Sequence, residues 1–105
     1  MTAIHIIKND PGLPAITPVQ SGSNIYSSGY WVIAEAKAKS LIGGKIFFHY
    51  RQTEPSFFGG IITDAEKVTE GEREGRVVFT FKADQNCKNV KTSRDGWAQE
   101  MKIVG

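Results

Sequence analysis

The chain has 105 residues and a formal net charge of +2. This length supports one modest core, so we expect residues 1–105 to form a single domain. The hydrophobic fraction of 40% and the charged fraction of 23% are those of a soluble globular protein and exclude wholesale disorder. One cysteine excludes an internal disulfide, and with two histidines it is a poor metal-ligand inventory, so we expect neither a metal nor a cofactor.

The N-terminal residues predict neither secretion nor membrane insertion. Residues 1–11 (MTAIHIIKNDP) lack the charged and long apolar regions of a signal peptide. No apolar run approaches the roughly 18 residues of a membrane-spanning helix. We therefore expect a cytoplasmic protein without a membrane partner. The small positive charge favours a nucleic-acid partner only if the basic residues gather on one face.

The first third of the chain predicts short strands separated by a long connection. Residues 3–8 (AIHIIK) have strand composition, and the Asn, Asp, Pro and Gly at 9–12 end that strand. Residues 11–29 carry three prolines, three glycines and four serines without a sustained period, which predicts an irregular loop. A short strand at 32–33 follows an aromatic pair.

Residues 34–42 (AEAKAKSLI) predict a short helix, because they are mostly good helix formers and Gly43 supplies a C-terminal stop. The next strand, at 46–51 (IFFHYR), carries rings on both faces, so it is central in a sheet or lines a pocket. A further strand covers 57–63 (FFGGIIT). Its glycine pair at 59–60 indicates a bulge, a bend or a close backbone approach.

The last third predicts a hairpin loop at 71–75 (GEREG) and an alternating strand at 76–84 (RVVFTFKAD). Residues 84–97 are polar and turn-rich, and residues 100–104 (EMKIV) predict a closing strand that contacts the first. The fold class is therefore mainly β (α+β), a strongly curved sheet or partly open barrel of five or six strands with one short helix. Four phenylalanines are expected in the core: Phe47, Phe48, Phe79 and Phe81.

The order of these segments resembles the EVE branch of the PUA-like superfamily, whose pseudo-barrel is shared with the YTH readers of methylated RNA. The resemblance covers residues 4–68. It is carried by five segments, at 8–11 (KNDP), 30–32 (YWV), 36–41 (AKAKSL), 44–50 (GKIFFHY) and 55–61 (PSFFGGI). Two EVE elements are replaced: Gly-Val-Arg-Asn by residues 32–35 (VIAE), and Tyr-His-Ser by residues 49–51 (HYR).

The resemblance implies a PUA-like pseudo-barrel and a non-enzymatic reader of a modified base in DNA or RNA. In such a reader the base stacks on aromatic rings while polar groups read its edge. We place Trp31 first in this aromatic cage, beside an open slot. The other ligand-binding candidates are Tyr30, Tyr50, Phe58, His49, Lys8, Asn9 and Trp97. The candidates for phosphate contacts are Lys37, Lys39, Lys45 and Arg51. A second local basic patch comprises Lys82, Lys88, Lys91 and Arg94.

Two other functions stay open, and neither assigns a catalytic residue. A ligand-free module that binds a protein partner would expose a flat apolar patch. A small amidohydrolase like those of the PUA-like ASCH branch would need a Lys, a Thr and a Glu in its pocket; this chain offers Lys8, Lys45, Thr63 and Glu66, although not in the required motif. The chain carries no phosphate-binding loop, zinc-protease motif or nucleophile elbow.

Overall fold

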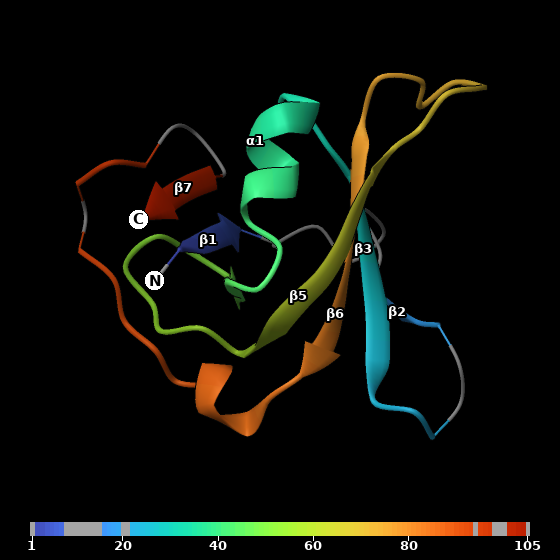
Figure 1. Cartoon of the computed structure of the whole chain (residues 1–105). Coiled ribbons are helices and arrows are strands. Elements are labelled where there is room, and N and C mark those ends of the chain that lie inside the picture. Colours follow the sequence, from blue (N-terminus) through green and yellow to red (C-terminus); the bar gives the residue numbers. More distant parts are fainter. Residues whose placement is uncertain (1, 8–15, 20–21, 94, 98–100, 105) are drawn as a thin grey trace.

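The computed structural model describes residues 2–7, 16–19, 22–93, 95–97 and 101–104 (Figure 1). Within these ranges the protein is mainly β, as predicted, but it has seven strands where five or six were expected. The strands are β1 (Ala3–Ile7), β2 (Ile16–Pro18), β3 (Ile25–Trp31), β4 (Lys45–His49), β5 (Phe58–Lys67), β6 (Val77–Ala83) and β7 (Met101–Val104). A short helix α1 (Glu35–Ser40) and a 3-10 turn η1 (Gln85–Cys87) complete the described elements.

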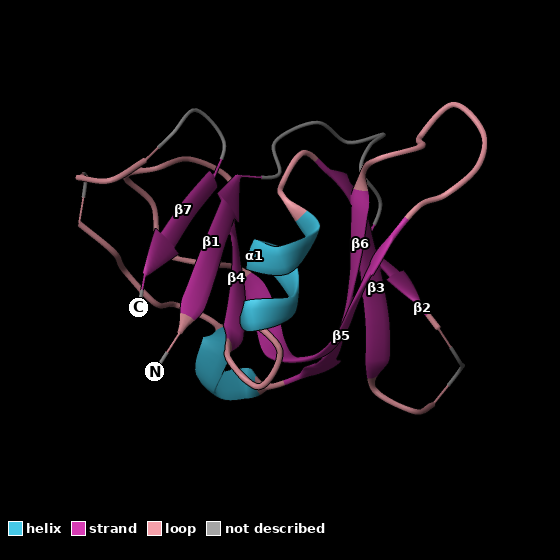
Figure 2. Cartoon of the chain, turned by 45° about the horizontal axis from the view of Figure 1, so that its top comes forward, coloured by secondary structure: helices cyan, strands magenta, loops and turns pink. Residues whose placement is uncertain are grey.

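All seven strands belong to one sheet in the order β2-β3-β6-β5-β4-β1-β7. The first and last strands pair as predicted, with β1 antiparallel to β7 and parallel to β4. The sheet therefore has two ends, at β2 and β7, within the part of the chain described. Figure 2 shows the sheet curving around α1, with β1 and β4 on one side of the helix and β3, β5 and β6 on the other. In the described residues, no helix has the length and apolar character needed to cross a membrane.

The predicted loop at 11–29 is wrong at Ile16–Pro18, which form β2, and from Ile25, where β3 begins and pairs with β6. The predicted strand at 32–33 is also wrong, because β3 ends at Trp31. Serine and glycine have low strand propensity, so the local sequence does not reveal β3. Tertiary pairing overrides that propensity. Gly29 is required here, since a Cβ at this position would lie 2.8 Å from Cγ2 of Val78.

The helix is confirmed but shorter than predicted, covering Glu35–Ser40. It buries Ala38, and Leu41 follows as the buried C-cap residue. Gly43 then adopts a φ of +91°, the left-handed conformation that favours glycine after a helix. The helix is held against β5 by the ammonium of Lys39, which donates a 2.8 Å hydrogen bond to the carbonyl of Ala65.

The four phenylalanines expected in the core are buried, with exposed fractions between 0% and 7%. The glycine pair at 59–60 is a site of close backbone approach. A Cβ at Gly59 would overlap the carbonyl oxygen of Ile46 on β4, and a Cβ at Gly60 would overlap that of Lys82 on β6. The irregularity of β5 lies further along, where the register against β6 shifts between Ile62 and Asp64.

Candidate functional site

Trp31 lies in the core, so the prediction of an exposed ring beside an open slot is wrong. Its side chain is 2% exposed and belongs to the main apolar cluster. Its indole Nε1 donates to Oγ of Ser28 at 3.2 Å, which satisfies the buried N–H. The physical reason is that Trp31 ends a strand paired with β6, opposite Val77, instead of ending a flexible loop.

The outcome for four other predicted ligand residues depends on whether the structure describes their side chains. Lys8 and Asn9 lie outside the described residues, and the structure describes the backbone of Tyr30 in β3 but not its side chain. His49 is fully buried and both of its ring nitrogens are occupied. The prediction of His49 as a ligand contact is therefore wrong.

His49 instead forms a buried hydrogen-bonded chain with His5 and the backbone of Glu54. Its Nδ1 lies 2.8 Å from the carbonyl oxygen of Glu54, so Nδ1 carries the proton and donates. Nε2 of the neutral ring is then the acceptor, and His5 Nδ1 donates to it across 2.8 Å. This chain ties β1 and the end of β4 to the loop that follows β4.

Burial keeps both histidines neutral at pH 7. The pKa of His5 is lowered from 6.5 to about 4, chiefly by burial and to a smaller extent by electrostatic interaction with His49 and Lys102. Burial also lowers the pKa of His49, against the opposing effect of its hydrogen bond to Glu54. Trp97 packs edge-on against both rings, at centroid distances of 6.3 Å from His5 and 5.7 Å from His49. Trp97 therefore covers this polar cluster.

A surface hollow of about 440 Å³ opens beside the loop that follows β4. We call it the Tyr50 hollow; its lining includes Tyr50, Glu54, Ser56, Phe57, Lys88 and Asn89. Tyr50 is 53% exposed, and its ring stacks on that of Phe57 with a centroid distance of 4.0 Å and an interplanar angle of 14°. The hollow thus presents a rigid pair of parallel rings to solvent.

A second hollow of about 230 Å³ lies at the junction of β3, β5 and η1. We call it the Tyr26 hollow; its lining includes Asn24, Tyr26, Phe58, Asp84, Gln85 and Lys88. The rings of Tyr26 and Phe58 meet edge to face at 5.2 Å. Of the residues predicted to bind ligand, Phe58 therefore contributes to this hollow and Tyr50 to the other, with no contribution to either from Trp31.

Lys88 lines both hollows, and its ammonium lies 5.9 Å from the centroid of the Phe58 ring. The turn that carries it is firmly anchored. Cys87, the last residue of η1, is fully buried. The hydroxyl of Ser56 bonds to the backbone before and after Lys88: Oγ donates to the carbonyl of Cys87 at 2.6 Å and accepts from the N–H of Val90 at 3.0 Å. Burial and the charge of Asp84 raise the pKa of the Cys87 thiol, against the effect of Lys45, so the thiol is protonated.

Two asparagines in the left-handed backbone conformation flank the pair of hollows. Asn24 has a φ of 67° and Asn89 a φ of 64°, and these are the non-glycine residues with positive φ in the described part of the chain. Asn24 lines the Tyr26 hollow and Asn89 lines the Tyr50 hollow. Residues held in this sparsely populated region cluster at ligand-binding sites.

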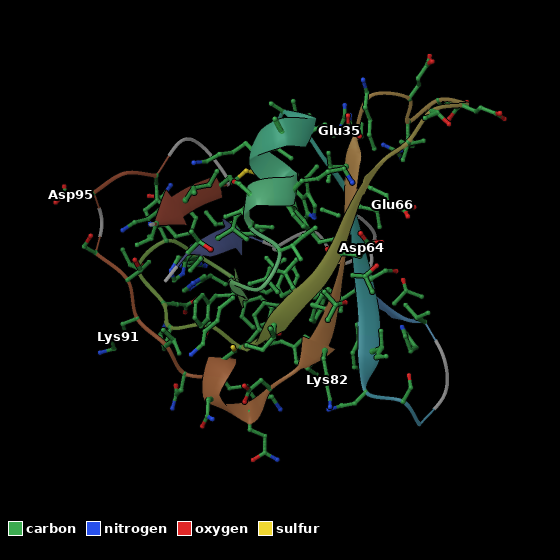
Figure 3. The ribbon with its side chains drawn as sticks, viewed as in Figure 1. Glu35, Asp64, Glu66, Lys82, Lys91 and Asp95 are labelled. Carbon is green, nitrogen blue, oxygen red and sulfur yellow. The ribbon has the colours of Figure 1, made fainter. Side chains whose placement is uncertain are left out.

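Several lysines lie near η1, together with the carboxylates of Asp84, its N-cap residue, and Glu54. Figure 3 shows Lys82 and Lys91 at the lower end of the molecule, with Glu35, Asp64 and Glu66 in its upper part. Lys82 is exposed on β6, just before the Asp84 cap of η1, and Lys91 is exposed in the segment after η1. A polyanion would therefore be attracted to the η1 end by Lys82, Lys88 and Lys91, and repelled locally by Asp84 and Glu54.

The residues predicted to contact phosphate are divided between two regions. The ammonium of Lys39 on α1 donates a hydrogen bond to the carbonyl of Ala65 on β5. The turn η1 contacts β5 at Gly60, where Sγ of Cys87 lies 3.8 Å from the Gly60 carbonyl oxygen. Ala65 is five positions beyond Gly60, which is roughly 17 Å along β5. Lys37 and Lys39 on α1 are thus remote from the hollows. Arg51, exposed and next to Tyr50 in the chain, is close to them.

The residues suggested for an amidohydrolase do not form an enclosed site. Thr63 and Glu66 are exposed on β5, and Thr63 Oγ1 donates to the carbonyl of Thr80 at 3.2 Å. Among the described residues, no group of three or more His, Cys, Asp or Glu side chains could hold a metal ion. The large exposed apolar side chains come from separate segments of the chain: Val19, Val32, Ile42, Tyr50 and Val104.

Comparison with known proteins identifies no relative: no protein-family model matches the chain, and no curated protein or solved structure matches it significantly. The resemblance to EVE domains therefore rests on the sequence motifs alone. Sequence analysis missed Asn24, Tyr26, Phe57 and Asn89 as parts of the site. The sequence feature that indicated this region was the predicted local basic patch, which includes Lys88.

Proposed function

We propose that this protein binds single-stranded nucleic acid on the surface formed by the Tyr50 hollow, the Tyr26 hollow and Lys88 between them. The observation that carries the proposal is the exposed ring of Tyr50, stacked on Phe57, next to a lysine that also borders a second aromatic hollow. Aromatic faces that stack bases and cations that follow the backbone are the two components of single-strand recognition.

The energetics support a stacking site at Tyr50. Its ring is already held parallel to Phe57, so binding a base costs little side-chain entropy. Stacking on an aromatic side chain contributes about 1–3 kcal/mol for each base. Lys88, Lys82, Lys91 and Arg51 supply positive charge around the rings, which attracts phosphate without regard to base sequence.

A single strand fits this surface better than a duplex, because base pairing hides the faces that would stack on the rings. Duplex recognition usually places a helix or a two-stranded ribbon in the major groove. The short helix α1 has one of its two lysines engaged with Ala65. The motifs that resemble EVE domains support the same class of ligand, although the cage centred on Trp31 is not available for it.

The experiment is fluorescence anisotropy with labelled oligonucleotides of roughly ten residues, a length within the usual site size of small domains. Single-stranded DNA and RNA are compared with the corresponding duplexes at low salt. We expect single strands to bind more tightly. Tyr50→Ala should weaken binding about 5- to 150-fold, the equivalent of about 1–3 kcal/mol.

Lys37→Ala is the control, because Lys37 is an exposed lysine on α1, remote from both hollows. It should leave binding unchanged, and circular dichroism should show that Lys37→Ala melts like the unmodified protein and that Tyr50→Ala stays folded at the temperature of the assay. Tighter binding to duplex, or an unchanged affinity in Tyr50→Ala, would contradict the proposal. Absence of binding to any oligonucleotide would instead favour a protein partner for the exposed rings.

A further inference from the structure

The two hollows and Lys88 form a repeating arrangement with a single positive charge at its centre. Phe57 and Phe58, consecutive in the chain, line different hollows, and each has its own tyrosine partner. Lys88 is the lining residue that the hollows share. A dinucleotide has the same pattern, with two flat bases on either side of one negatively charged phosphate.

The charges within each hollow indicate which part of the ligand lies where. Each lining includes one carboxylate, Glu54 in the Tyr50 hollow and Asp84 in the Tyr26 hollow. A phosphate placed in either hollow would meet a like charge, whereas a base could donate from an amino group or ring N–H. The ammonium of Lys88, between the carboxylates, is the favourable place for a phosphate.

The position of Lys88 is set by the backbone on both sides of it. Its own N–H donates to the carbonyl of Gln85 at 3.1 Å, and Asn89 N–H donates to the carbonyl of Ser56 at 2.6 Å. Cys87, just before it, is buried and bound through its carbonyl to Ser56 Oγ. The backbone of Lys88 is therefore fixed where the two hollows meet, and its long side chain can reach a phosphate that links a base in one hollow to a base in the other.

The Tyr26 hollow also carries a group that can discriminate between bases. Asn24 donates Nδ2 to the carbonyl of Ala83 at 3.1 Å, which orients the side-chain amide. Asn24 then offers its carbonyl oxygen Oδ1 as an acceptor and its second N–H as a donor, and the Asp84 carboxylate is a further acceptor. An exocyclic amine, present on adenine, cytosine and guanine, carries two N–H donors and can satisfy both acceptors, whereas uracil and thymine have a single ring N–H.

We infer that the site takes two consecutive nucleotides, with one base in each hollow, the linking phosphate on Lys88, and an amine-bearing base in the Tyr26 hollow. This inference rests on the proposed function and deepens it. It assigns Lys88 to one phosphate, the Tyr50–Phe57 pair to one base, and Asn24 to the edge of the other base.

The test is competition against a labelled oligonucleotide by adenylate ligands of one, two, three and four residues, in RNA and DNA forms. The affinity should rise by about tenfold or more from the mononucleotide to the dinucleotide, because the second base adds a stacking contact. A third or fourth nucleotide should raise the affinity only by the number of additional positions in which two consecutive nucleotides of the ligand can occupy the site. An equal gain for every added residue would overturn the inference.

The phosphate assignment is tested with a dinucleotide whose linkage is an uncharged methylphosphonate. Removing the charge should weaken binding to the unmodified protein and have no effect in Lys88→Ala, since the double change removes the same interaction twice. Lys37→Ala, the matched control on α1 and remote from both hollows, should keep the full sensitivity to linkage charge. Sensitivity that persists in Lys88→Ala would exclude Lys88 as the phosphate ligand.

Base preference is read from adenine and cytosine dinucleotides compared with uracil dinucleotides. The amine-bearing ligands should bind more tightly, and Asn24→Ala should reduce that difference. Equal binding of all dinucleotides to the unmodified protein would overturn the assignment of Asn24. If long oligonucleotides bind but the dinucleotide is no better than the mononucleotide, this inference alone fails. If nothing binds, the proposed function fails.

Discussion

Trp31 and Tyr50 are both large aromatic side chains, but their environments are opposite. Trp31 is 2% exposed, and its N–H is bound to Ser28. Tyr50 is 53% exposed: its ring stacks on that of Phe57 and otherwise remains in contact with water. A buried ring stabilises the fold through packing, whereas an exposed ring keeps area for a ligand. Substitution at these positions should therefore separate stability from binding.

Trp31→Ala should lower the free energy of unfolding by about 3–5 kcal/mol, because it removes a buried ring and leaves a cavity in the core. Tyr50→Ala should lower it by about 1 kcal/mol or less, because its ring is largely exposed and loses mainly one stacking contact. Urea denaturation followed by circular dichroism measures both values. A Trp31→Ala variant that unfolds at the same urea concentration as the unmodified protein would show that the ring is not part of the core.

The buried histidines should make the protein sensitive to acid. Because the folded-state pKa of His5 is lowered from 6.5 to about 4, the unfolded state takes up the proton first as the pH falls. The contribution of His5 to stability is complete above pH 6.5, decreases as the pH falls toward 4, and changes no further below that. The expected loss over this window is about 3 kcal/mol.

The measurement for His5 is the free energy of unfolding at several pH values, in the unmodified protein and in His5→Gln. Glutamine keeps a donor for Nε2 of His49 but does not titrate, so the difference between the two proteins isolates His5. That difference should change between pH 6.5 and 4 and be constant above pH 6.5. If the difference in free energy of unfolding between the two proteins stays constant from pH 6.5 to pH 4, the pKa of His5 is not lowered in the folded state.

The close packing of β4 and η1 against β5 determines where the backbone of Lys88 lies. Gly59 on β5 lies against the carbonyl of Ile46 on β4, and Cβ of Cys87 would be 2.9 Å from a Cβ added at Gly59. The absence of a side chain at Gly59 therefore lets β4 and η1 approach β5 together. Ser56 then bonds to the backbone of Cys87 and Val90 and holds the turn in place.

Gly59→Ala should lower the free energy of unfolding by about 3 kcal/mol, because the added methyl group overlaps backbone atoms that cannot move independently of the sheet. Gly71→Ala is the matched control: Gly71 has a φ of +85° and no atom within 4 Å of an added Cβ. Its cost should be about 1–2 kcal/mol, from backbone conformation alone. Denaturant titration of both variants gives the comparison, and equal costs would mean that the close approach at Gly59 relaxes freely.

Charge is distributed unevenly over the molecule although the formal net charge is only +2. Lys82 and Lys91 lie at the η1 end, and Glu35, Asp64 and Glu66 lie away from it (Figure 3). The linings of the two hollows come from separate segments of the chain, which include Asn24, Tyr50, Phe58 and Lys88. A nucleic-acid partner would therefore be attracted by a few local charges and not by the overall charge.

The affinity for single strands should depend weakly on salt. With one to three phosphate contacts, the slope of log K against log salt concentration should lie between about −0.7 and −2. Lys88→Ala should reduce the magnitude of that slope by about 0.7, the value for one phosphate on a single strand. Anisotropy titrations over a series of salt concentrations measure it. An unchanged slope in Lys88→Ala would indicate that its ammonium contacts no phosphate.

Local sequence was sufficient for several features of the fold. Alternation placed Phe79 and Phe81 in the core, helix formers ending at Gly43 predicted α1, and the apolar C-terminal segment predicted the strand that pairs with β1. These features depend on side chains that are neighbours in the chain. Strand β3 escaped prediction because its Ser-Gly composition is weakly strand-forming and its pairing with β2 and β6 stabilises it.

The site depended on contacts between distant segments. Residues 24–26, 50–58 and 84–89 meet only after β5 has paired with both β4 and β6. Composition could therefore indicate that the chain has many rings and a basic stretch, but not which rings remain uncovered. A ring is buried or exposed according to the segments that pack over it, and for Trp31 and Tyr50 those segments come from elsewhere in the chain.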